Sequence, residues 1–169
     1  MVHHRLPQPQ RRTGIAGGVL VLTLVFLLSG CSTAHLEADR TALANVVARA
    51  QLPDGVGSIA CEEVALFDVE DGVTSYVGAC LSEQNSLSVV TSMAETAHAI
   101  AAEVDSTPSA WTCEPLSEAT SFCYAFIPWS ANSRNDIRIN ARVAGLHREL
   151  PPPDLAGDVQ FAVVLVPTE

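Results

Sequence analysis

The sequence predicts an α+β domain: an antiparallel sheet of about five strands, two helices packed on one face, and two disulfides. Three observations carry this prediction. Two segments space their apolar residues as helices do, with a hairpin signal between them. Segments with strand character then fill the C-terminal half, and four cysteines, an even number, follow residue 60: Cys61, Cys80, Cys113 and Cys123.

The first expected helix runs from His35 to Gln51. Ser32 or Thr33 can cap its start, and Pro53-Asp54-Gly55 ends it. Its apolar residues recur at helical spacing, at Leu36, Leu43, Val47 and Ala50.

A hairpin is expected next, because Asp71-Gly72 separates two β-prone runs, Val64 to Val69 and Val73 to Leu81. A two-residue turn there places Cys61 opposite Ser82, which leaves Cys80 two residues away on the same face. One bulge would bring the two thiols within disulfide range. We therefore expect a disulfide between Cys61 and Cys80.

The other two cysteines close a local loop over the polar stretch Glu114 to Ser121, so we pair Cys113 with Cys123. Metal binding or redox catalysis is the alternative for these thiols. Such sites need converging thiolates or a Cys-x-x-Cys motif, and no two of these cysteines are closer than ten positions. In a domain that is exported, an even cysteine count favours disulfides over free thiols.

The second expected helix runs from Leu87 to Val104, capped by Asn85 or Ser86. Its apolar residues form one stripe, at Val89, Val90, Met93, Ala97, Ile100 and Val104.

Strands follow. Ser121 to Pro128 is aromatic and apolar, and Ile137 to Val143 alternates apolar with polar residues, which predicts a strand with one wet face. Val159 to Val166 is almost wholly apolar, which predicts a central strand covered on both sides.

The N-terminus combines a cationic start at Arg5, Arg11 and Arg12 with an apolar run from Ile15 to Leu28, closed by Leu28-Ser29-Gly30-Cys31. These features resemble the precursor signal of bacterial lipoproteins. The resemblance implies that residues 1–30 are a signal peptide and that the Cys31 thiol is acylated. Residues 31–34 are then a short lipidated tether and residues 35–169 one extracytoplasmic domain. It also implies a cell membrane location, held by the lipid.

Two alternatives for this segment remain. An uncleaved membrane anchor would keep the apolar run in the bilayer, but about 14 residues fall short of the ~18 to 20 that a spanning helix needs. Twin-arginine export is suggested by Arg11-Arg12. Gly14 and Ile15 follow where that signal prefers a bulky apolar pair, so ordinary export fits better.

The negative net charge of the chain argues against nucleic acids and anionic membrane surfaces as partners. All 19 acidic residues follow Cys31, against six arginines and no lysine. A field of that sign repels phosphate backbones and anionic headgroups, so we expect no nucleic acid partner and no electrostatic membrane docking.

No motif of a hydrolase, nucleotide-binding or metal site is present, and we expect no cofactor and no metal. Asp68, Glu70 and Asp71 are one residue short of a calcium loop. Glu62 and Glu63, adjacent on an expected strand, would point to opposite faces.

One positive cluster stands out. Arg134, Arg138 and Arg142 share a strand face with Asp136 and Asn140, and Trp129 lies beside them. The plain interpretation is a solvated sheet face. The functional one is a docking strip for an acidic envelope protein or a wall polymer.

Two functions follow from these patterns. The first is a non-enzymatic lipoprotein of the cell envelope that binds a partner or supports a complex. The alternative is a small envelope hydrolase that uses His98 or His147 with a carboxylate. An enzyme should hold a histidine and an acid within hydrogen-bond reach in a concave site.

Overall fold

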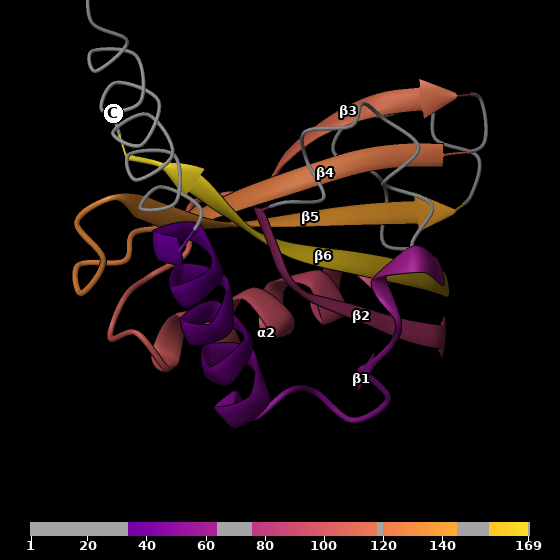
Figure 1. Cartoon of the computed structure of the whole chain (residues 1–169). Coiled ribbons are helices and arrows are strands. Elements are labelled where there is room, and N and C mark those ends of the chain that lie inside the picture. The colour runs from indigo at the N-terminus through magenta and orange to yellow at the C-terminus, as the bar shows by residue number, and fades with distance from the viewer. Residues whose placement is uncertain (1–33, 64–75, 118–119, 145–155, 169) are drawn as a thin grey trace, which may run out of the picture. The chain divides into compact units, whose positions relative to one another are not determined.

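The computed structural model describes residues 34–63, 76–117, 120–144 and 156–168. Residues from Leu36 onward form one compact unit. Within it six antiparallel strands make one sheet in the order β1-β2-β6-β5-β4-β3, where about five were expected (Figure 1). The elements are a first helix at residues 34–49, β1 (Gly57–Ser58), the 3-10 helix η1 (Cys61–Glu63), β2 (Val77–Ser86), α2 (Val89–Ala102), β3 (Thr112–Ser117), β4 (Thr120–Ile127), β5 (Asn135–Ala144) and β6 (Gly157–Pro167).

The two helices cover one face of this sheet, as predicted. The main core lies between them and the inward side chains of the strands; its largest fully buried members include Phe161, Leu43, Leu81, Ile100 and Ile139. Strand β6 lies between β2 and β5, and its residues 161–165 are all buried. The apolar run of the sequence is thus a central strand, as expected.

Helix α2 begins two residues later than expected, at Val89. Ser88 is its N-cap, and the Ser88 side chain accepts a hydrogen bond from the Thr91 backbone N at 3.1 Å. The two predicted caps lie in β2 instead: Ser86 ends that strand, and Asn85 bends it with a φ of 55°. The predicted helix start and the predicted N-cap are both wrong because mostly polar residues run from the end of β2 to the start of α2, so the sequence does not mark where the strand ends.

The disulfide between Cys61 and Cys80 is present, but the predicted route to it is wrong. Cys61 lies in η1 and not in a strand, and Gly57 takes the place opposite Ser82. Glu62 also lies in η1, so the strand geometry expected for it does not apply. The predicted turn at Asp71-Gly72 and the run before it, Val64 to Val69, lie outside the described residues. The run after it, Val73 to Leu81, is described from residue 76 and forms the start of β2, which pairs with β1 and β6.

The disulfide between Cys113 and Cys123 is also present, and the two cysteines lie directly opposite one another in β3 and β4. The loop expected between them is wrong, since Thr112–Ser117 is a strand. Strand β3 was not predicted because it lies at the edge of the sheet with largely exposed side chains. Its sequence therefore lacks the alternation of apolar and polar residues that marks a half-buried strand.

Candidate functional site

The face of the sheet opposite the helices carries an unusual set of side chains, here called the outer face. Residues of β4 and β5 alternate, so that Cys123, Ile127, Ile137 and Ile139 enter the main core and their chain neighbours point the other way. Three cross-strand pairs make up the outer face: Phe122 with Arg142, Tyr124 with Asn140, and Phe126 with Arg138. Ala162 and Val164 of β6 continue it beyond Asn140 and Arg138.

An aromatic row runs along β4 on this face. The ring centroids of Phe122 and Tyr124 are 6.0 Å apart, and those of Tyr124 and Phe126 are 5.6 Å apart with the rings edge to face. Contacts of this kind hold aromatic side chains in fixed orientations. Phe126 remains 39% exposed, so the row ends in an accessible apolar ring.

Beside the aromatic row, β5 holds two polar groups that lack partners. Asn140 is only 5% exposed, yet within the described residues its Oδ1 accepts no hydrogen bond. The Arg138 Nε is likewise buried without an acceptor. Burial lowers the pKa of Arg138, an effect that the nearby Tyr124 hydroxyl partly offsets. A guanidinium nevertheless stays charged at neutral pH, so this is a half-buried cation without a counterion in the described structure.

The remaining described arginines are used differently. Arg40 contacts Glu37 at 3.1 Å, Arg49 contacts Glu103 at 3.1 Å and Arg134 contacts Asp39 at 2.8 Å. Across the ranges that the structure describes, only Arg138 and Arg142 have no ion pair. Both lie on the outer face of a chain in which acidic residues outnumber basic ones by 19 to 9.

The predicted docking strip is therefore only partly assembled. Arg134 precedes β5, and its side chain turns toward Asp39 of the first helix, away from Arg138 and Arg142. Trp129 is not at the surface: it is 8% exposed and belongs to the main core. Its backbone N–H donates a hydrogen bond to Asp136 Oδ1 at 2.9 Å.

Sequence reasoning placed Asn140 on this face but missed its burial and the aromatic row. The signal for the row was the alternation of three aromatic residues with small or apolar ones in Phe122 to Ile127.

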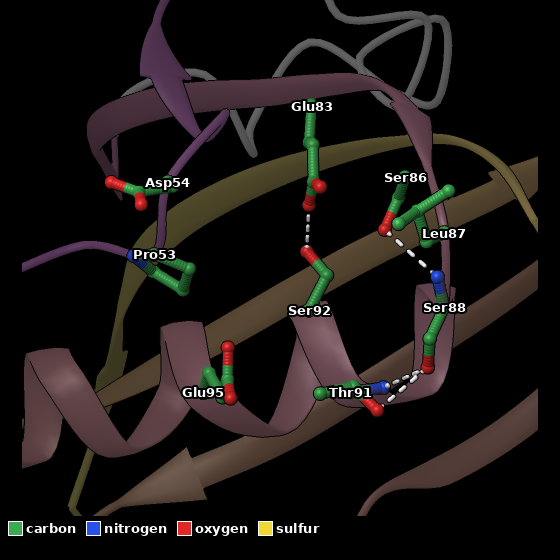
Figure 2. Close-up of a pocket in the computed structure, with 9 residues that line it drawn as sticks. All are labelled: Pro53, Asp54, Glu83, Ser86, Leu87, Ser88, Thr91, Ser92 and Glu95. Atoms are coloured by element: carbon green, nitrogen blue, oxygen red, sulfur yellow. Dashed lines mark hydrogen bonds between the residues drawn. The ribbon is translucent and has the colours of Figure 1, made fainter.

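A second surface feature is a cleft of about 330 Å³ between the start of α2, the end of β2 and residues 53–54 (Figure 2). Asp54, Glu83 and Glu95 line it together with several hydroxyl groups. In Figure 2 Glu83 and Ser92 point toward each other and are hydrogen bonded. No group of three His, Cys, Asp or Glu side chains in the described residues is arranged to hold a metal ion.

Of the two histidines of the hydrolase alternative, only His98 lies in the described part of the chain. His98 is exposed on α2 and, in the described part of the chain, has no hydrogen-bonded carboxylate partner. It does not line the cleft. His147 lies outside the described residues.

Comparisons with protein-family models, curated proteins and solved structures find no match to this chain. Among the described helices, none is both long and apolar enough to cross a membrane.

Proposed function

We propose that this chain is a lipoprotein of the cell envelope, anchored at the extracytoplasmic side of the membrane by acyl chains on Cys31, and that its domain is a non-enzymatic binding module for an acidic partner. The observation that carries the binding role is the pair Arg138 and Arg142 on the outer face. Both lack a carboxylate partner in the described structure, although every other described arginine has one.

The anchoring role rests on the resemblance of residues 1–31 to a lipoprotein precursor signal. Acyl chains on one cysteine supply stable attachment without a spanning helix. The described first helix includes residue 34, only three positions after Cys31. A tether this short would keep the domain, and with it the outer face, close to the bilayer.

The binding role makes sense in terms of charge. A half-buried guanidinium without a partner is costly in the free protein, and an anion supplied by a partner removes that cost. The rest of the acidic chain repels such a partner, which confines attraction to the outer face.

Photocrosslinking in intact cells tests this proposal. A photoreactive phenylalanine replaces Phe126 on the outer face, or Leu87, a control position that is 93% exposed beside the cleft. We expect an adduct with an envelope component from position 126, lost when Arg138 and Arg142 are changed to Glu. Equal adducts from both positions, or an adduct unaffected by the charge reversal, would rule out the outer face as the binding surface.

A further inference from the structure

We infer that the ligand of the outer face is an acidic saccharide, a sugar chain that carries carboxylate or phosphate groups. This inference rests on the proposed binding function and names the ligand class of the same surface. It follows from three properties of the outer face. Two neighbouring polar groups there lack hydrogen-bond partners in the described structure, the aromatic row lies beside them, and the backbone groups of the central strands are all paired within the sheet.

The two polar groups of the outer face without partners in the described structure are one hydrogen-bond donor and one acceptor. Arg138 Nε is a donor and Asn140 Oδ1 an acceptor, both buried and both without a partner in the described structure. Two residues apart on one strand, the side chains stand about 7 Å from each other. Both atoms are covered in the free protein, so a ligand reaches them only when the side chains of the outer face shift. A ligand that then satisfies both presents an anion and a hydrogen-bond donor at that short separation. A sugar ring bearing an acidic group and free hydroxyls presents both.

The apolar row lies where the ring of such a sugar would rest. Phe126 is the cross-strand partner of Arg138, and Tyr124 is the partner of Asn140. Each polar group thus has an aromatic neighbour on the adjacent strand. The C–H groups of a sugar ring pack favourably on aromatic side chains, while its substituents remain free to reach the polar groups.

A second cation extends this arrangement along the strand. Arg142 lies four residues from Arg138, about 13 to 14 Å away on the same face. It pairs with Phe122 across the strands, which repeats the combination of cation and aromatic ring. A polymer with repeated acidic groups can engage both combinations, so it should bind more tightly than a single acidic sugar.

An acidic peptide fits this surface less well. Peptides that bind sheets do so mainly by adding a strand at an edge, where backbone groups are free. Strand β5 lies between β4 and β6 and is paired along its length with both. The outer face therefore offers side chains alone, and the row of aromatic rings has no particular complement in a run of acidic side chains.

Calorimetric titration of the full chain in detergent separates these ligands. The probes are polygalacturonate, a phosphorylated mannan, neutral dextran and polyglutamate, at low and at physiological salt. We expect polygalacturonate, with or without the phosphorylated mannan, to bind at least tenfold more tightly than dextran and polyglutamate, with an affinity that falls as salt rises.

Two variants test the assigned contacts. Asn140→Leu removes the buried acceptor, and Phe126→Ala removes an exposed ring without opening the core. Each should weaken glycan binding at least fivefold, and Phe126→Ala should leave any polyglutamate binding unchanged. The matched control Leu87→Ala, exposed on another part of the surface, should change nothing.

Two results would overturn the inference. If polyglutamate binds as tightly as the acidic glycans and Phe126→Ala has no effect, the ligand class is wrong while the binding function stands. If no anionic probe binds and position 126 also yields no adduct in cells, the binding function itself falls.

Discussion

Arg134 and Asp39 form a bidentate ion pair between the turn before β5 and the first helix. The Arg134 Nη2 lies 2.8 Å from Asp39 Oδ1, and its Nε lies 3.1 Å from Oδ2. The Asn135 side chain donates to the same Oδ2 at 3.0 Å. Asp39 is only 7% exposed. Its carboxylate links the first helix to the turn before β5 and holds the Arg134 side chain away from the outer face.

Asp39→Asn should lower the free energy of unfolding at pH 7 by about 1 kcal/mol, because it weakens charge-assisted hydrogen bonds between a buried carboxylate and a half-exposed guanidinium. The control Glu37→Gln breaks an exposed pair on the same helix and should cost under about 0.5 kcal/mol. Urea unfolding of the full chain measures both.

The effect of Asp39→Asn should also depend on pH. Hydrogen bonds from Arg134 hold the pKa of Asp39 below its ordinary value of 3.8. The carboxylate therefore stabilises the fold fully above that value, and this stabilisation is lost as the pH falls through the lower pKa of the folded state. The gap between wild type and Asp39→Asn should shrink below about pH 4. A gap of equal size at pH 3 and pH 7 would contradict this account.

Gly78→Ala should destabilise the domain by about 1 to 3 kcal/mol. A Cβ at Gly78 would lie 2.6 Å from the side chain of Leu43, which is fully buried in the core between the first helix and the sheet. Gly57→Ala is the matched control, since a Cβ there meets nothing within 4 Å. Thermal unfolding of both variants should separate them clearly; similar midpoints would mean that Leu43 moves aside freely.

Each disulfide should stabilise the fold by about 3 kcal/mol in the chain-entropy model. The bridge from Cys61 to Cys80 spans 19 positions and that from Cys113 to Cys123 spans 10, so replacing the first pair by Ser should cost slightly more. Denaturant unfolding of the two double variants compares them. Non-reducing peptide mapping provides an independent check, and recovery of a Cys61 to Cys113 peptide would show that the pairing is wrong.

Cys31→Ala should abolish acyl-lipid labelling and leave a precursor that retains residues 1–30. The reason is that acylation requires the thiol and precedes removal of the signal in the lipoprotein precursors that this segment resembles. Mass spectrometry of the native protein checks the same point. An unmodified Cys31 with the N-terminal segment still attached would end the lipoprotein proposal.

Local sequence patterns predicted the parts of this fold whose environment is local. The apolar run of β6 indicated a covered strand, and the alternation of β5 indicated a strand with one wet face. Both strands are present, but the wet face is wrong: the polar side chains of β5 are buried or half-buried, and none of its described residues is fully exposed. Pairings between distant segments were harder. Arg134 turns to a carboxylate 95 positions away, and the burial of Asn140 depends on which strands flank β5. Those contacts decide which arginines remain on the outer face, so the candidate site could be predicted only in outline.

The most direct test of the outer face compares the thermal midpoints of wild type, Arg138→Met and Arg134→Met, with and without polygalacturonate. If Arg138 is kept for an anionic partner, Arg138→Met should leave the midpoint unchanged or raise it, because it removes a half-buried cation that has no counterion among the described residues. Arg134→Met should lower it. Polygalacturonate should raise the midpoint of wild type and Arg134→Met but not of Arg138→Met. A loss of stability in Arg138→Met as large as in Arg134→Met, with an undiminished shift by the polymer, would contradict the account.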